Sequence, residues 1–228
     1  MSAPSDSDTT TAFWSEPANA QAWIKADSQV ELLAMPRRIA AEIVAQDRPS
    51  TLRVADIGSG TGSFLAAFLD RLPDTRGVWT DVSDTMRHAA GESLARFGDR
   101  VDYRLMDVRD VAGLPDELDV VMTSRCLHHL DRRELAEFYA AVAARLAPGG
   151  WLVNLDHTRR DPDWDGRLRS ARGALLPRKG PDTHHHDRPL PTLAEHLEAL
   201  QSAGFADVGV AWQAFVTDLI MARKWSDS

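Results

Sequence analysis

The residues with the clearest chemical meaning are three alternate glycines, Gly58, Gly60 and Gly62, and the acid that precedes them, Asp56. Glycine lets the backbone turn sharply and leaves no side chain between the backbone and a ligand. The apolar run before this loop is typical of a buried strand, and the apolar spacing after it predicts a helix. A strand, a glycine turn and a helix N-terminus form the usual nucleotide cradle of a doubly wound sheet. The loop therefore predicts a site for a nucleotide-like cofactor.

The positions of two acids favour one cofactor over another. Asp56 stands before the glycines, where it can receive the ammonium group of an amino acid moiety, which NAD lacks. Asp81 ends the next predicted strand, 19 residues beyond Gly62, where a carboxylate can accept both ribose hydroxyls. A ligand with a ribose and an amino acid moiety is S-adenosylmethionine, and the sequence favours it.

Outside this loop the chain alternates between apolar runs typical of strands and amphipathic stretches typical of helices. The predicted strands are 51–57, 77–82, 101–107, 118–124 and 151–157. Two predicted helices, 132–147 and 192–203, each begin with a capping residue that is followed three positions later by Glu. Two β-rich stretches, 208–215 and 218–224, are too close for a crossover helix, so we expect them to pair as an antiparallel hairpin.

With these motifs in this order, residues 51–157 and 192–224 resemble a class I S-adenosylmethionine-dependent methyltransferase. The resemblance implies an α/β fold, with a Rossmann-like, seven-stranded, mostly parallel sheet whose last strand is reversed. Helices would cover both faces, and a helical cap would precede the sheet. It also implies an enzyme that uses S-adenosyl-L-methionine to methylate a small molecule, and we expect an oxygen acceptor.

The resemblance implies a set of residues that contact the cofactor. These are Asp56, Gly58, Gly60, Gly62, Asp81, Met86, Asp107, Val108 and Arg125. In the family, the match to Met86 packs on adenine and the match to Asp107 bonds the adenine amino group. The alternative for Met86 is ordinary core filling. Arg37 or Arg38 could reach the cofactor carboxylate, although a solvated charge on a helix is the favoured interpretation of both.

The catalytic candidates are two histidines. Methyl transfer from a sulfonium is an in-line displacement, so the protein mainly aligns the reactants and excludes water. A hydroxyl or protonated amine must also lose a proton to a base. His157 is the first candidate because it follows the fifth strand directly, and His129, after the fourth strand, is the second. The alternatives are that His157 is an exposed loop residue and that His128 and His129 seal a turn.

Three other residues could belong to the site. Cys126 is expected to be a packed small residue, because methyl transfer needs no covalent intermediate. Trp14 and Trp23 could line the pocket, although core packing is the default for each.

Composition divides the chain into a tail and one domain. Residues 1–12 are rich in Ser, Thr and Asp and are predicted to be disordered. Residues 13–228 are predicted to form a single methyltransferase domain, with 13–46 as a helical cap that Pro36 breaks or restarts. Residues 158–191 are predicted to be a lid insertion over the acceptor pocket.

The lid contains His184, His185 and His186. Neighbouring residues on an extended loop cannot all face one ion, so we expect no metal site there.

Net charge, cysteine count and the length of apolar runs indicate which partners and which location to expect. The chain has 228 residues and a formal net charge of −8, which argues against general affinity for nucleic acid. It has one cysteine and no apolar run long enough to span a membrane, so we expect a cytoplasmic protein. The expected partner is a small-molecule substrate, and the sequence leaves the oligomeric state open.

Two other functions compete with this interpretation. An NAD-type oxidoreductase would carry Gly-x-Gly-x-x-Gly and a separate substrate domain, and this chain has neither. A catalytically silent, cofactor-binding subunit of a methyltransferase often loses part of the glycine loop, which is complete here.

Overall fold

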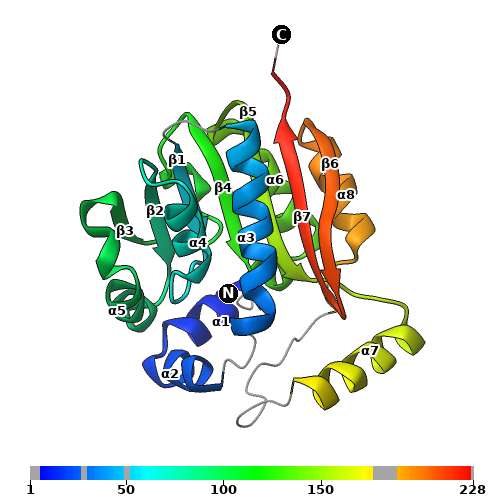
Figure 1. The fold of residues 1–228 in the computed structure, drawn as a ribbon. Coiled ribbons are helices and arrows are strands. Elements are labelled where there is room, and N and C mark those ends of the chain that lie inside the picture. The colour runs from blue at the N-terminus through cyan, green and yellow to red at the C-terminus, as the bar shows by residue number, and fades with distance from the viewer. Residues whose placement is uncertain (1–5, 27–29, 49–51, 177–188, 227–228) are drawn as a thin grey trace, which may run out of the picture.

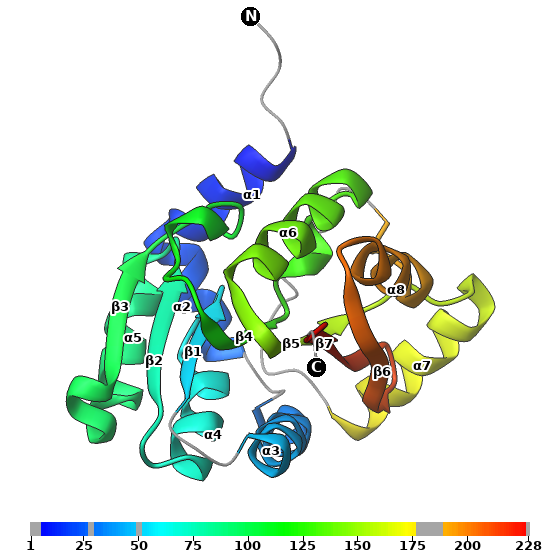
Figure 2. The same ribbon diagram turned by 90° about the horizontal axis from the view of Figure 1, so that it is seen from above.

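The computed structural model describes residues 6–26, 30–48, 52–176 and 189–226. These residues form a seven-stranded sheet with helices on both faces (Figures 1 and 2). The strands are β1 (Arg53–Ile57), β2 (Arg76–Asp81), β3 (Val101–Leu105), β4 (Leu118–Ser124), β5 (Leu146–His157), β6 (Phe205–Ala214) and β7 (Thr217–Lys224). The helices are α1 (Asp6–Ser15), α2 (Pro17–Ala26), α3 (Val30–Asp47), α4 (Ser63–Arg71), α5 (Asp84–Ser93), α6 (Arg132–Arg145), α7 (Pro162–Leu175) and α8 (Leu193–Ser202).

The order of the strands reverses next to β1. Across the sheet the order is β3-β2-β1-β4-β5-β7-β6. The ends of the central strands lie level, because Ile57 pairs in register with Thr80 of β2 and with Thr123 of β4. In doubly wound sheets a ligand binds beyond the carboxyl ends of the strands, where the order reverses. The topology therefore places a ligand site at the ends of β1 and β4.

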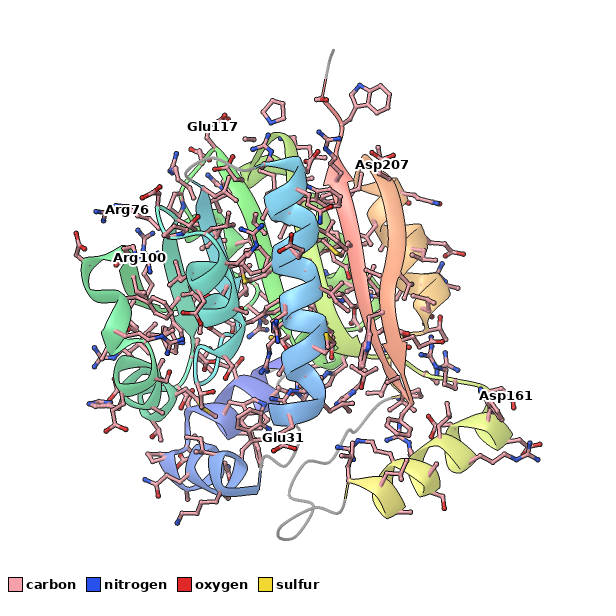
Figure 3. The ribbon with its side chains drawn as sticks, viewed as in Figure 1. Glu31, Arg76, Arg100, Glu117, Asp161 and Asp207 are labelled. Carbon is pink, nitrogen blue, oxygen red and sulfur yellow. The ribbon has the colours of Figure 1, made fainter. Side chains whose placement is uncertain are left out.

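Helices gather at this carboxyl edge of the sheet. Glu117 directly precedes β4 and lies at the upper edge in Figure 3, so the lower edge carries the carboxyl ends. Glu31, at the start of α3, lies at the lower edge, where α1 and α2 are also found (Figures 1 and 3). Asp161, just before α7, lies toward the same edge on the β6 side of the molecule. The site is thus bordered by elements from distant parts of the chain.

The last strand runs against its neighbours. β7 is antiparallel to both β5 and β6, which confirms the predicted hairpin. The pairing places Asp218 opposite Asp156, and Thr217 opposite His157. The predicted fold class, a Rossmann-like, mostly parallel sheet with a reversed last strand, is confirmed.

Two helices begin where their capping signals predict. Asp131 accepts a hydrogen bond from the backbone N–H of Glu134 at 2.8 Å, and the Glu134 side chain accepts from the backbone N–H of Asp131 at 2.9 Å. Thr192 and Glu195 form the same capping box at the start of α8. Each such cap stabilises its helix by roughly 1 kcal/mol. The caps therefore set where α6 and α8 begin.

The hydrophobic core has one cluster on each face of the sheet. On the α3–α4–α5 face, apolar side chains one turn apart are buried, as with Phe64 and Phe68 of α4. On the other face, Leu135 and Tyr139 of α6 pack with Leu200 of α8. Burying one such side chain is worth about 1.5–3 kcal/mol. Figure 2 shows these two helical layers on either side of the sheet.

The N-terminal region differs from its prediction. Residues 6–12, predicted to be disordered, begin helix α1. The prediction took account of polar composition alone, whereas α1 is joined to the sheet through the hydroxyl of Thr11, which donates to Asp107 at 2.6 Å. α3 also continues through Pro36, because burial of Leu33 and Val44 on the core offsets the lost backbone hydrogen bond.

The predicted lid, 158–191, is described only in part. Its described portion contains α7, a helix none of whose residues is buried. His184, His185 and His186 lie outside the described residues. Whether this segment closes over a substrate stays a prediction. In the described part of the chain, every helix is too short or too polar to cross a membrane.

Candidate functional site

A pocket of about 910 Å³, its open mouth included, lies at the carboxyl ends of the central strands. One wall consists of the glycine loop and the residues that follow β2 and β3. The rest of the lining comes from α1, α2 and the loop after β4, and α3 contributes Arg37. The pocket is thus lined by the strand ends, the glycine loop and the N-terminal helices together.

The three glycines of the loop serve different purposes. All have positive φ, at 62° for Gly58, 55° for Gly60 and 80° for Gly62. A Cβ on Gly58 would lie 2.5 Å from Cys126 Sγ, and one on Gly62 would lie 2.6 Å from Leu94 Cδ1. A Cβ on Gly60 would meet no described atom within 4 Å. Gly58 and Gly60 line the pocket, whereas Gly62 is closely packed against Leu94 and is not among the lining residues, so its cofactor contact stays a prediction.

Asp56 lies beneath the loop and does not line the pocket. Its Oδ2 accepts hydrogen bonds from Ser59 Oγ at 2.6 Å and from the backbone N–H of Leu65 at 3.1 Å. Its Oδ1 is buried without a hydrogen-bond partner among the described residues. Burial raises the pKa of Asp56 to about 7, against the lowering effect of the Ser59 and Leu65 bonds and of the Arg37 charge. Asp56 therefore braces the loop, and its contact with an ammonium group stays a prediction.

Asp81 lies on the pocket wall at the end of β2. It accepts backbone hydrogen bonds from Gly60 and Ser83, each at 3.0 Å. Burial raises its pKa, while these two bonds act in the opposite direction. Met86 also lines the pocket and is 4% exposed. The strand therefore presents a fixed carboxylate beside an apolar surface, as adjoining ribose and adenine groups would require.

Asp107 and Val108, two of the predicted cofactor contacts, line the pocket beyond β3. Asp107 Oδ1 accepts from the backbone N–H and Nε of Arg109, and Oδ2 accepts from the Thr11 hydroxyl. Burial alone would raise the pKa of Asp107, but the bonds from Arg109 and Thr11 outweigh it and lower the pKa to about 2. This carboxylate is therefore ionised, and α1 is bonded to it directly.

Aromatic residues and an arginine from α1, α2 and the loop after β4 form another part of the lining. The Trp14 ring lies 6.3 Å from the Trp23 ring at an angle of 88°, and 6.3 Å from the His129 ring. The Arg125 guanidinium lies 4.6 Å from the centre of the Trp23 ring. All four residues line the pocket, so the pocket contacts anticipated for Trp14 and Trp23 are present.

A buried acid positions the loop that carries His129. Asp156 is 0% exposed and accepts from the backbone N–H groups of Cys126 at 3.2 Å and of His128 at 3.1 Å. His128 Nδ1 lies 2.5 Å from Asp156 Oδ1, and the His128 and His129 rings are 4.2 Å apart. Asp156 thus fixes the loop after β4, and with it the place of His129 on the pocket wall. Sequence reasoning did not predict this role for Asp156, and the signal that could have indicated it is an acid at the end of a buried strand.

His157 is placed differently from His129. It is not among the described residues that line the pocket, and its Nδ1 lies 2.9 Å from Thr217 Oγ1. Burial, and then the charges of His128, Arg125 and Arg172, lower the pKa of His157 well below 6.5, while Asp156 opposes them. The ring is therefore neutral at pH 7, with Thr217 as its partner.

Two neighbouring arginines on α3 have different environments. Arg37 is 6% exposed and lines the pocket, whereas Arg38 is exposed. The solvated role favoured for both therefore holds for Arg38 alone. Among the described residues, no group of three His, Cys, Asp or Glu side chains could hold a metal ion.

Comparisons with known proteins agree with this geometry. Residues 54–150 match a family model described as a methyltransferase domain. A 114-residue segment is 32% identical to the hybrid PKS-NRPS synthetase apdA of Emericella nidulans, over 47% of this chain and 3% of the synthetase. An O-methyltransferase family protein from Burkholderia thailandensis is 25% identical with a TM-score of 0.68, over 97% of this chain and 63% of that protein. Human N-acetylserotonin methyltransferase, solved in complex with SAM, is 19% identical with a TM-score of 0.66, over 95% of this chain and 59% of that one. This chain spans less than two thirds of each of these proteins.

Proposed function

We propose that this chain, which belongs to the class I S-adenosylmethionine-dependent methyltransferase family, transfers a methyl group from S-adenosylmethionine to an oxygen of a small molecule. The observation that supports this most strongly is the pocket wall made by Gly58, Gly60, Asp81 and Asp107 at the reversal of the strand order. A cytoplasmic location and the absence of a nucleic-acid partner belong to the same proposal, and the net charge of −8 favours the latter.

The residues present fit this cofactor. The open space where a Gly60 Cβ would stand allows close approach of a ligand to the loop backbone. Asp81 would accept the ribose hydroxyls, and Asp107 with Met86 would hold the adenine. Arg37, nearly buried at the pocket, would pair with the carboxylate of the methionine part. When bound, S-adenosylmethionine supplies a methyl group activated by its sulfonium.

The chain's own contribution is alignment, water exclusion and removal of a proton. Trp14 and Trp23 cover the pocket from the cap and exclude water from the reacting atoms. His129 lies on the wall and is our preferred base for a hydroxyl acceptor, because Asp156 and His128 hold its loop in place. His157 remains a second candidate that would have to reach the acceptor from outside the lining residues.

A binding assay followed by a turnover assay tests the proposal. The chain should bind S-adenosylhomocysteine, the demethylated product, with one site per chain in calorimetry. It should then transfer a ¹³C-labelled methyl group to a member of a panel of phenols, carboxylates and amines. The carbon chemical shift of the product distinguishes oxygen, nitrogen and carbon acceptors.

The outcomes separate the competing functions. If the chain does not bind S-adenosylhomocysteine, the proposal is wrong. Binding without turnover on any class of acceptor would favour the silent partner subunit, and transfer to carbon would overturn the oxygen assignment alone.

A further inference from the structure

Both backbone groups of Gly60 are bonded to side chains of one strand. The indole Nε1–H of Trp79 donates to Gly60 O at 2.9 Å, and the Gly60 N–H donates to Asp81 Oδ2 at 3.0 Å. Trp79 and Asp81 are two residues apart on β2, so their side chains lie on the same face of the sheet. We call these two side chains and their bonds the Gly60 clamp. The clamp holds the two peptide units that flank the Gly60 Cα from one strand.

The indole of the Gly60 clamp is itself held in place by its neighbours. Trp79 is 0% exposed. It pairs in register with Asp56 of β1 and with Tyr103 of β3. The centre of the Tyr103 ring lies 5.9 Å from that of Trp79, at an interplanar angle of 46°. An indole packed in this way has little freedom to turn, so its N–H stays directed at Gly60 O.

The backbone of Gly60 faces the open pocket. Gly60 has a φ of 55° and lines the pocket, and a Cβ there would meet no described atom within 4 Å. Packing on the pocket side therefore does not hold Gly60, and its position depends on the two bonds from β2. A buried indole usually finds a partner for its N–H, so the alternative is that the Trp79 bond serves the core alone.

The residues on either side of Gly60 are tied by other bonds. The Ser59 N–H donates to Thr80 O at 2.9 Å, and Ser93 Oγ donates to Thr61 O at 2.5 Å. Loss of one bond at Gly60 should therefore shift the loop locally without releasing it. We expect a moderate change in cofactor affinity from such a shift, and no complete loss.

We propose that Trp79 is a positioning residue for the cofactor, because its indole N–H holds the Gly60 peptide where the loop meets S-adenosylmethionine. This inference rests on the proposed function. Trp79 is not among the described residues that line the pocket, so it acts through Gly60 and not by contact. Gly60 is also bonded to Asp81, so a displaced Gly60 would disturb the carboxylate that we place on the ribose.

The test compares two tryptophans that each donate one bond of the same length. Trp151 Nε1 donates to Asp47 Oδ2 at 2.9 Å, and Trp151 is likewise not among the described residues that line the pocket. Trp79→Phe and Trp151→Phe each remove one such bond. In calorimetry we expect the Kd for S-adenosylhomocysteine to rise about 5- to 10-fold in Trp79→Phe, and to stay within about twofold in Trp151→Phe.

A second variant separates the N–H from the bulk of the ring. Trp79→β-(3-benzothienyl)alanine keeps the shape of the indole and replaces the N–H with sulfur, so it leaves no cavity in the core. It should raise the Kd by the same factor as Trp79→Phe, and it decides the question if Trp79→Phe does not fold. Denaturant titration of all three variants reports how far each one destabilises the fold.

Affinity and stability together give distinct outcomes. Weaker binding in the folded variants at position 79, with normal binding in Trp151→Phe, supports the inference. Normal binding in the benzothienylalanine variant would show that Trp79 serves the core alone, and equal losses of affinity in Trp79→Phe and Trp151→Phe would trace the effect to general destabilisation. Either result overturns the inference and leaves the proposed function intact. If the unchanged chain does not bind S-adenosylhomocysteine, the proposed function fails instead.

Discussion

The two walls of the pocket are held in place by different interactions. The strand-end wall, made by Gly58, Gly60, Asp81, Met86 and Asp107, is fixed by backbone geometry: positive φ at the glycines and backbone N–H groups that bond Asp81. The cap wall, made by α1 and α2, contacts the rest of the site through side chains. Its contacts are the Thr11 bond to Asp107, the Trp14 ring on His129 and the Trp23 ring on Arg125.

This difference suits two ligands with different demands. A cofactor presents the same atoms in every reaction, so a wall built from backbone can match it closely. An acceptor is specific to the enzyme, and a wall built from side chains on short helices can change without disturbing the sheet. We therefore expect substitutions on the strand-end wall to change cofactor affinity, and substitutions on the cap wall and its partners to change acceptor use.

The largest effect is expected at His129, which lines the pocket. His129→Ala should lower turnover of a phenolic acceptor by about 10²–10⁴-fold, because the acceptor proton loses its base. Steady-state rates across pH should also lose their low-pH limb, while affinity for S-adenosylhomocysteine stays unchanged. His157→Ala is the matched comparison and should have a much smaller effect, because His157 is not among the described residues that line the pocket.

A large loss of turnover in His157→Ala, with little loss in His129→Ala, would place the base at the end of β5. If neither variant lowers turnover, the acceptor is already an anion and the chain acts by alignment alone.

Asp56 makes the stability of the strand-end wall dependent on pH. The pKa of Asp56 is raised from its ordinary value of 3.8 to about 7 in the folded chain. Between pH 3.8 and 7 the folded chain therefore keeps a proton on Asp56 that the unfolded chain has lost. Stability should therefore fall as pH rises from about 4 to 7, by up to about 4 kcal/mol if the full shift is realised. Asp56→Asn should remove this component in denaturant titrations at several pH values. A variant with the same slope as the unchanged chain would contradict the raised pKa.

Asp81→Ala should weaken binding of S-adenosylmethionine and of its demethylated product by roughly 1.5–3 kcal/mol, because charge-assisted bonds to the ribose are lost. That corresponds to about 10- to 150-fold in Kd. Asp110→Ala is the control, since Asp110 is exposed and does not line the pocket. Equal affinity in the two variants would remove Asp81 from the site.

Gly60 and Gly62 separate ligand contact from folding. Gly60→Ala should reduce cofactor affinity about 10-fold, because its Cβ would stand where no described atom lies within 4 Å and where we place the cofactor. Both substitutions should lower the unfolding free energy by ~1–2 kcal/mol, because Gly60 and Gly62 have φ of 55° and 80°. Gly62→Ala should lower it further, because its Cβ alone would clash with Leu94, and it should leave cofactor affinity closer to normal. Calorimetry and denaturant titration of both variants check these expectations. Similar losses of affinity in both would show that Gly60 has no special contact.

The last comparison is between adjacent arginines on α3. Arg37→Gln should weaken cofactor binding by about 1.5 kcal/mol, because the buried guanidinium would lose its pairing with the methionine carboxylate. Arg38→Gln should leave affinity unchanged, because Arg38 is exposed. Direct binding measurements on the two variants settle the assignment, and equal values would exclude Arg37 as the carboxylate partner.

The strand-end wall could be predicted from sequence because its signals are local. The spacing of Gly58 and Gly60, and the acids Asp81 and Asp107 at strand ends, place these residues on the pocket before any packing is known. Asp56 shows the limit of such signals. The same position in the loop fits a ligand contact or a buried brace, and the bonds to Ser59 and Leu65, which the sequence does not show, support the brace.

The cap wall could not be predicted in the same way, because tertiary packing decides it. Arg37 and Arg38 are chemically identical neighbours, and the orientation of α3 buries one and exposes the other. Thr11 lies in a polar run whose composition predicts disorder, whereas it bonds to Asp107, 96 residues away in the chain. Likewise, both His129 and His157 follow strand ends, and the turn after β4 brings only His129 to the pocket.

The claim that the strand-end wall binds the cofactor and the cap wall binds the acceptor is tested most directly by one calorimetric comparison. S-adenosylhomocysteine is titrated into the unchanged chain, into Asp81→Ala and into Trp23→Leu, each checked for folding beforehand. We expect one site in the unchanged chain, a Kd about 10- to 150-fold weaker in Asp81→Ala, and a Kd within about threefold in Trp23→Leu. Weak binding in Trp23→Leu with normal binding in Asp81→Ala would contradict the assignment of the cofactor to the strand-end wall.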